Sequence, residues 1–236
     1  MAAKKRKSED TVCEKCGGLH FILTEEGARP CECYKGFMIQ QNLAAARIPR
    51  KFHNKSMDTF KARDKKRKTL RSDIQNYIKG FKPDNVGEAR RGLLFMGGVG
   101  TGKTHLAISI LRAVIEKGYT GYYCNVADFL ARLRDSYGGD TSYDEMDMID
   151  LVSRVDFLVL DDLGAEKPTD WMRDRLYNII NRRYETNRPV LVTTNLIDID
   201  ELEEHVGKRI VSRLCEMCQI CDHFPADDWR KREMGL

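Results

Sequence analysis

One stretch of the chain combines glycines, a lysine and a hydroxyl residue in the order that polyphosphate binding requires. The stretch consists of Gly97, Gly98, Val99, Gly100, Thr101, Gly102, Lys103 and Thr104, which matches G-x-x-x-x-G-K-[ST]. Glycines let the main chain curl so that several N–H groups converge on phosphate oxygens. We expect Lys103 to reach the β- and γ-phosphates of ATP and the Thr104 hydroxyl to bind Mg²⁺. His105 completes the predicted nucleotide-binding segment.

A second candidate site follows the apolar run Phe157–Leu160, which ends in Asp161 and Asp162. A buried strand that ends in two acids places carboxylates at the edge of the sheet where phosphates bind. We predict that Asp161 binds Mg²⁺ through water and that Asp162 polarises the attacking water. Glu166 lies close in sequence and could share or replace the role of Asp162 as the base.

A third apolar run, residues 190–195, also ends in polar side chains, the last of which is Asn195. Asn195 could hold the attacking water or the γ-phosphate. Asn commonly ends strands, so the residue type alone indicates little. Its position one predicted helix after the acidic strand strengthens the interpretation.

Four of the eight cysteines crowd near the start of the chain: Cys13, Cys16, Cys31 and Cys33. Four thiolates in a short segment are the ligand set that tetrahedral Zn²⁺ prefers. The segment is too small to bury a core, so the metal would supply its folding free energy. His20 is a possible substitute ligand, and free thiols are the alternative to zinc.

The other cysteines are Cys124, Cys215, Cys218 and Cys221. The three-residue spacing of the last three could suggest an iron–sulfur site. We prefer buried core thiols, because Cys215 and Cys218 fall on a predicted helix and Cys221 on the last predicted strand.

Strands and helices alternate from Gly92 onward, which predicts an α/β fold with a five-stranded parallel sheet covered on both faces. The strands are expected over residues 92–96, 121–126, 157–160, 189–193 and 220–224. The helices are expected over residues 103–117, 127–137, 143–153, 171–184, 199–206 and 209–217. Ahead of this domain, residues 38–47 read as a helical linker.

Three regions are expected: a disordered basic tail (1–12), a zinc-binding module with a helical linker (13–47) and a nucleotide-binding domain (48–236). The basic run Lys4–Lys7 has no apolar segment after it, so a secretory signal is not expected and the cytoplasm is the default. No apolar run approaches the ~20 residues of a membrane span. The net charge of +4 does not by itself indicate nucleic-acid binding.

The order of these motifs resembles the AAA+ ATPases. Within that class, the segments Leu160–Glu166 and Ser212–Cys218 resemble the DnaC/DnaI/IstB group of helicase loaders and transposition helper ATPases. The approach to the nucleotide domain, Ile48–Phe52 and Met57–Phe60, is also similar to that group. The resemblance implies an AAA+ domain without a C-terminal lid domain, which agrees with the few residues after Arg213.

The resemblance also implies that ATP hydrolysis depends on assembly of several subunits. Arg213 would be the arginine finger that reaches the ATP site of a neighbouring subunit in a homo-oligomeric spiral or ring. Arg209, one helical turn away, is the competing candidate. A solvated surface arginine is the plain alternative.

Two basic groups could contact DNA phosphates. Arg132 and Arg134 fall on a helix pair that resembles the insertion with which initiators and loaders surround single-stranded DNA. A second group consists of Lys65, Lys66, Arg67 and Lys68. Charge runs are more often solvated faces, so neither group indicates DNA binding by itself.

The function implied by the resemblance is that of an ATPase that loads a DnaB-type replicative helicase onto single-stranded DNA, with ATP, Mg²⁺ and Zn²⁺ as cofactors. The cysteine module would hold the helicase. Two alternatives remain: a transposition helper ATPase of the IstB kind, and a zinc-ribbon adaptor whose nucleotide domain only switches conformation.

Overall fold

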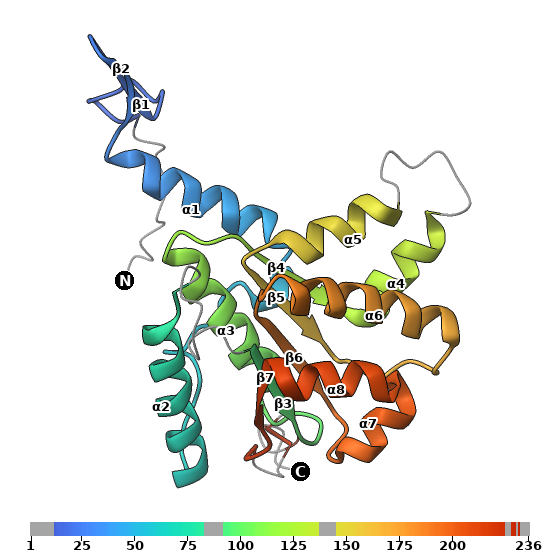
Figure 1. Ribbon diagram of the computed structural model, residues 1–236. Helices are drawn as coiled ribbons and strands as arrows, with labels where there is room; N and C mark the ends of the chain where they lie inside the picture. Colours follow the sequence, from blue (N-terminus) through green and yellow to red (C-terminus); the bar gives the residue numbers. More distant parts are fainter. Residues whose placement is uncertain (1–11, 83–91, 137–144, 225–227, 230, 232–236) are drawn as a thin grey trace.

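The computed structural model describes residues 12–82, 92–136, 145–224, 228–229 and 231 (Figure 1). The tail predicted over residues 1–12 lies, apart from Val12, outside this described part. The facing ends of the helices predicted over 127–137 and 143–153, at residues 137 and 143–144, lie outside it as well.

Five parallel strands form one sheet in the order β4-β5-β6-β3-β7. The strands are β3 (Gly92–Met96), β4 (Gly121–Asn125), β5 (Phe157–Asp161), β6 (Val190–Thr194) and β7 (Cys218–Cys221). The predicted α/β fold with a five-stranded parallel sheet is therefore confirmed. Every residue of the neighbouring strands β5, β6 and β3 is buried, because helices cover both faces.

Alternate residues of each strand pack against different helices. Leu93 and Phe95 of β3 join the core under α2 (Lys65–Gly80) and α3 (Lys103–Glu116). Leu94 of the same strand joins the core on the opposite face. That face is covered by α4 (Val126–Asp135), α5 (Glu145–Arg154), α6 (Asp170–Glu185), α7 (Ile199–Val206) and α8 (Lys208–Met217).

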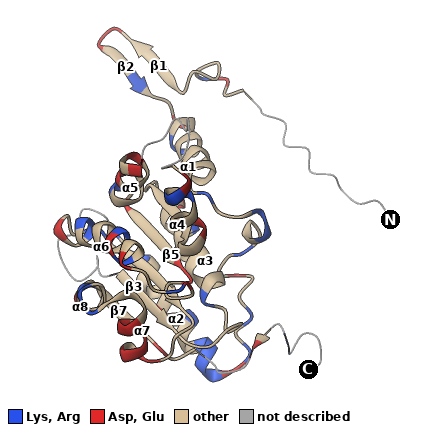
Figure 2. Ribbon diagram, turned by 90° about the vertical axis from the view of Figure 1, so that its right-hand side faces the viewer, with Lys and Arg blue, Asp and Glu red and all other residues tan. Residues whose placement is uncertain are grey.

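The N-terminal hairpin, β1 (Phe21–Thr24) and β2 (Gly27–Pro30), projects away from the sheet domain at the end of α1 (Figures 1 and 2). Helix α1 runs over Cys33–Ala45, so it begins five residues before the predicted Met38. The chain after α1 is joined to the edge of the sheet, because the Tyr123 N–H of β4 donates to the Ala46 carbonyl at 2.8 Å. The short helix η1 (Arg50–Phe52) follows.

The last strand differs from its prediction. It covers Cys218–Cys221 instead of residues 220–224, so Cys218 lies on a strand and not on a helix. Cys218 is buried against β3, where its Sγ lies 2.9 Å from the place a Cβ would occupy on Gly92. Cys215 is exposed on α8, so the prediction of a buried thiol is wrong there. The helix stops at Met217 because the chain must pair with Gly92 from Cys218 onward.

Arg183 of α6 is a fully buried cation that joins several loops. Its guanidinium donates to the carbonyls of Val152 at 2.9 Å, Val155 at 3.0 Å and Pro189 at 2.6 Å. Burial lowers the pKa of this guanidinium from its ordinary value. The planar, multi-donor group satisfies carbonyls that would otherwise be buried without partners.

We expect Arg183→Met to lower the free energy of unfolding by about 3 kcal/mol or more, because several buried carbonyls would lose their donor. Urea unfolding followed by circular dichroism measures the loss. Arg154→Met is the matched control, since the Arg154 side chain is 79% exposed. The control should change stability by no more than ~0.5 kcal/mol. Equal stability of the two variants would contradict the structural role of Arg183.

Candidate nucleotide site and cysteine cluster

The loop from Gly97 to Thr104 joins β3 to α3 and has the backbone that its glycines permit. Gly97, Gly100 and Gly102 have φ values of +148°, +75° and +102°, which side chains rarely allow. A Cβ on Gly102 would lie 3.1 Å from the Phe60 ring, and a Cβ on Gly100 would overlap the Asp228 carboxylate. The loop therefore requires glycine at these positions for conformation and for space.

Lys103 is buried at the start of α3 and points back into the loop. Its Nζ donates to the carbonyls of Gly97 at 2.6 Å and Gly98 at 2.7 Å, and to Asn195 Oδ1 at 2.9 Å. The structure thus brings together two residues that the sequence separates by 92 positions. Asn195 follows β6, which lies between β5 and β3 in the sheet.

Asp161 is a buried carboxylate at the end of β5 that accepts three hydroxyl hydrogen bonds. The donors are Thr104 Oγ1 at 2.9 Å, Thr193 Oγ1 at 2.7 Å and Tyr123 OH at 2.7 Å. Carboxylate and hydroxyl oxygens are ligands that suit Mg²⁺, so Thr104 and Asp161 fit the predicted metal. Burial and the nearby Asp161 charge raise the pKa of the Tyr123 phenol, so the phenol stays protonated and donates to Asp161.

Tyr123 and Thr193 are site residues that sequence reasoning missed. Thr193 lies in the polar end of the 190–195 run, so the sequence pattern could have indicated it as a site residue. Tyr123 gives no such signal, because an aromatic residue inside a strand reads as core. Its phenol meets Asp161 only because β4 and β5 pair in parallel.

Asp162 and Glu166 occupy different environments. Asp162 has a φ of +65°, donates its N–H to Thr193 Oγ1 at 2.9 Å and accepts from Asn195 Nδ2. Glu166 is half-buried, and neither of its carboxylate oxygens has a hydrogen-bond partner among the described residues. Burial, and to a smaller degree the charge of Asp162, raise the pKa of Glu166.

Lys103, Asp161, Asp162 and Asn195 line a cavity of about 640 Å³, whereas Glu166 is not among its lining residues. The lining includes the loop residues 99–105, Asp161, Asp162 and Asn195, and continues past Phe60 to Trp229. A volume of this size is typical of small-molecule and cofactor sites. The site combines a loop that depends on glycines, the buried Lys103, and the Thr104 hydroxyl beside the Asp161 carboxylate. This combination fits a nucleoside triphosphate with Mg²⁺.

His105 also lines this cavity and fixes one of its walls. Its Nε2 lies 3.0 Å from the Ser56 carbonyl and 3.1 Å from Thr59 Oγ1. Burial lowers the pKa of the ring, which favours the neutral form. An edge-on contact with Phe60 completes the contact between α3 and the segment that precedes α2.

The two candidate arginine fingers lie on α8 and are not among the residues that line the cavity. The Arg213 guanidinium stacks on Tyr184 with its Cζ 3.9 Å from the ring centre. The Arg209 guanidinium stacks on Tyr177 at 4.3 Å and donates to its hydroxyl at 3.0 Å. A role for either arginine in hydrolysis therefore requires the site of another subunit.

The predicted basic groups differ in exposure. Arg132 and Arg134 are exposed on α4, and Arg134 lies over the Trp171 ring. The three lysines at the start of α2 are exposed, but Arg67 among them is buried and paired with Asp64. Arg67 therefore does not belong to a solvent-facing basic surface.

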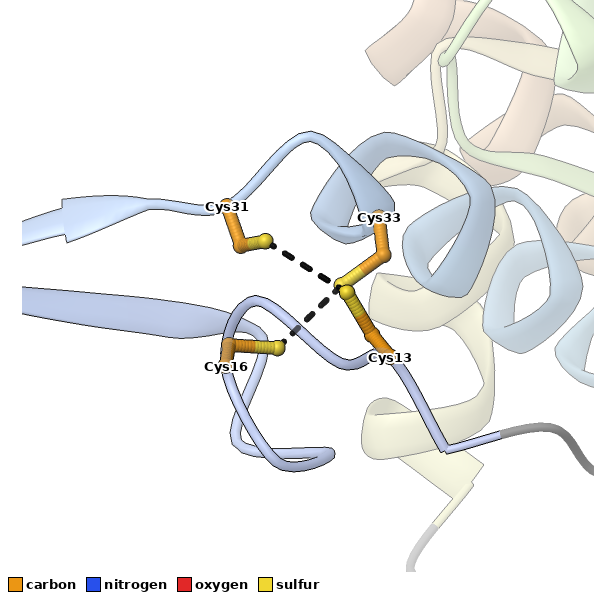
Figure 3. Close-up of side chains that lie close together, drawn as sticks. All are labelled: Cys13, Cys16, Cys31 and Cys33. Carbon is orange, nitrogen blue, oxygen red and sulfur yellow. Dashed lines mark hydrogen bonds between the residues drawn. The ribbon is translucent and has the colours of Figure 1, made fainter.

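The four N-terminal cysteines converge at one point (Figure 3). All four Sγ atoms lie within 4.8 Å of one another, with Cys13 to Cys31 at 3.8 Å and Cys16 to Cys33 at 3.5 Å. A tetrahedral Zn²⁺ with Zn–S bonds of ~2.3 Å requires Sγ atoms ~3.8 Å apart. The geometry of the cluster therefore fits zinc.

His20 lies beside the cluster. Its Nδ1 is 3.4 Å from Cys33 Sγ, and its ring stacks on Phe37 with centres 4.0 Å apart. This geometry favours a contact with a ligand sulfur over replacement of a cysteine, as is usual for groups around metal ligands.

We expect the purified protein to contain one zinc ion per chain and Cys31→Ser to lose it, with the segment 13–34 becoming sensitive to protease. Metal analysis and limited proteolysis measure both effects. Cys215→Ser is the matched control, because Cys215 is exposed and outside the cluster. Unchanged zinc content in Cys31→Ser would contradict the assignment.

A glycine loop after β3, an acidic end on β5 and an asparagine after the strand between them define a P-loop nucleotide-binding domain of the AAA+ class. Within that class, the chain belongs to the family of IstB-like ATP binding proteins, which it matches over residues 37–231.

The similar proteins include helicase loaders. The replicative helicase loader DnaC of Escherichia coli strain K12 is 26% identical over 182 residues, which cover 77% of this chain and 71% of DnaC. A crystal structure of the DnaC helicase loader superposes with a TM-score of 0.63 and 31% identity, over 73% of this chain and 98% of that one. A DnaI crystal structure, at 22% identity and a TM-score of 0.60, shares the fold.

Among the described residues, no helix combines the length and apolar character needed to cross a bilayer.

Proposed function

We propose that this chain is an ATP-dependent loader that delivers a DnaB-type replicative helicase to single-stranded DNA during replication initiation. The observation that carries the proposal is the match to the DnaC helicase loader structure at 31% identity over 98% of that chain. In this proposal the nucleotide site binds ATP and the cysteine module holds the helicase. We place it in the cytoplasm.

In this proposal the residues around the cavity divide the work of ATP hydrolysis. Lys103 and the backbone N–H groups of the loop would hold the phosphates, and Thr104 with Asp161 would hold Mg²⁺, which would supply positive charge against the phosphates. Tyr123 and Thr193 fix the Asp161 carboxylate by hydrogen bonds at 2.7 Å each. Asn195 contacts both Lys103 and Asp162, so it links the phosphate-binding side to the base.

Asp162 is the favoured base because it lines the cavity and Asn195 orients it. We expect Asp162→Asn to lower kcat by roughly 100-fold and Glu166→Gln to lower it much less. The two substitutions are matched, because each replaces a carboxylate with the corresponding amide. The reverse order would assign the base to Glu166.

The pH dependence provides an independent measure of the same assignment. The pKa of Glu166 is raised, so its basic form is lost as pH falls through that raised value. If Glu166 were the base, hydrolysis would decline at a higher pH than an ordinary carboxylate allows, and Glu166→Gln would remove that decline. With Asp162 as the base, Glu166→Gln should leave the acid limb of the profile unchanged.

The proposed loading activity is tested with purified components. The protein, incubated with ATP and a DnaB-type helicase, should co-purify with the helicase and increase helicase-dependent unwinding of forked DNA. A protein that captures a transposase and not the helicase would contradict the proposal. That outcome would support the second candidate, a transposition helper ATPase, which the IstB-like family match favours.

Native protein that binds ATP and the helicase without hydrolysing ATP would support a nucleotide-switched adaptor.

The Cys31→Ser variant separates the contribution of the N-terminal module in the same assay. Loss of helicase capture with preserved ATP binding is expected, because the module projects away from the nucleotide domain (Figure 1).

A further inference from the structure

Trp229 lies against the phosphate loop although it follows the last strand of the sheet. The backbone N–H of Trp229 donates to the Gly100 carbonyl at 3.1 Å, and Trp229 lines the same cavity as Lys103 and Asp161. The neighbouring Asp228 carboxylate occupies the space where Gly100 would carry a side chain. The C-terminal segment and the loop are therefore in direct contact.

Trp229 and the predicted Mg²⁺ ligand Asp161 belong to parts of the chain on opposite sides of β3 in the sheet. Asp161 is the last residue of β5, and Asn195 directly follows β6. Both strands lie on one side of β3 in the sheet. Trp229 follows β7, which pairs with the other side of β3. The predicted phosphate and Mg²⁺ ligands Lys103, Thr104 and Asp161 leave the cavity wall at Gly100 and Trp229 available to the rest of a bound nucleotide.

Three cations surround the Trp229 ring. Lys61 Nζ, Arg63 Cζ and Arg67 Cζ lie 5.6, 5.1 and 5.6 Å from its centre. Arg67 is itself buried and paired with Asp64, so it is a fixed support. Cations at these distances attract the electron-rich face of an indole and hold its position.

We propose that Trp229 forms the base-binding wall of the nucleotide site, where its indole contacts the purine and is held by Lys61, Arg63 and Arg67. The inference rests on the proposed nucleotide site and adds the element that recognises the nucleoside part of the ligand. Stacking between an aromatic side chain and a base is favourable and tolerant of base identity. Phe60, which packs on Gly102, lines the same cavity.

The chain contains two tryptophans, which makes the test specific. Trp171 lies on α6 beside Arg134 and Arg175 and is not among the cavity residues. In the full-length Trp171→Phe variant, Trp229 is the only tryptophan that fluoresces. Its emission should change on addition of Mg-ADP and stay constant on addition of inorganic tripolyphosphate, which lacks a base.

Affinity measurements give the second readout. Calorimetry should show Trp229→Leu binding Mg-ADP roughly tenfold more weakly than the native protein, with unchanged affinity for tripolyphosphate. Trp229→Phe should retain most of the affinity, since a ring remains. Arg63→Gln should shift the Trp229 emission to the red and weaken ADP binding in the same direction. Circular dichroism checks that each variant is folded.

The outcomes separate this inference from the function it rests on. Native affinity for Mg-ADP in Trp229→Leu, or constant Trp229 emission at saturating Mg-ADP, would overturn the inference and leave the nucleotide site intact. Equal loss of ADP and tripolyphosphate binding would also overturn it, because Trp229 would then act on the phosphate loop. Native protein that binds neither ligand would overturn the nucleotide site itself.

Discussion

Lys103→Ala should reduce ATP hydrolysis by roughly 1,000-fold or more, because the loop would lose the cation that we expect to contact the β- and γ-phosphates. The structure places Lys103 Nζ 2.6–2.9 Å from two loop carbonyls and Asn195. Alanine at this position would remove a charge from the centre of the site without changing the glycines that shape the loop. Phosphate release under saturating ATP measures the effect.

Lys35→Ala is the control for Lys103→Ala, since Lys35 is exposed on α1. It should hydrolyse ATP at the native rate. Circular dichroism should report the same fold for both variants. Hydrolysis in Lys103→Ala within about tenfold of the native rate would mean that the loop does not hold the phosphates as a P-loop does.

Arg213→Ala should also lower hydrolysis by roughly 1,000-fold if Arg213 acts as an arginine finger. Arg213 lies on α8, stacked on Tyr184 and away from the cavity of its own chain. The loss should therefore appear in assembled protein, whereas the affinity of the single subunit for ATP should not change. Arg209→Ala provides the comparison, because Arg209 occupies the preceding turn of the same helix.

Mixing two inactive variants tests whether the arginine acts between subunits. Lys103→Ala keeps Arg213 but lacks a working site, and Arg213→Ala keeps the site but lacks the finger. The mixture should recover part of the native hydrolysis. A mixture as inactive as its components, with Arg209→Ala also fully active, would mean that neither arginine completes a neighbour's site.

The sequence alone was sufficient for features encoded by neighbouring residues. The glycine–lysine–threonine loop, the acidic end of β5 and the four clustered cysteines each depend on spacing within a short segment. Alternating apolar strands and amphipathic helices predicted the parallel sheet, because both faces of such a sheet are buried. The helix predicted over residues 209–217 agrees with α8. Boundaries differ at α1, which begins five residues before its predicted start, and at the last strand, which begins at Cys218 because it pairs with Gly92.

Only the tertiary structure decided which distant side chains meet. The contact between Lys103 and Asn195, the Tyr123 hydrogen bond to Asp161 and the position of Trp229 at the phosphate loop all follow from the strand order β4-β5-β6-β3-β7. Spacing along the chain specifies the period of each strand but not its neighbours in the sheet. The tertiary structure also decided that Arg67 is buried and Cys215 exposed, because the exposure of a side chain depends on the elements that pack around it.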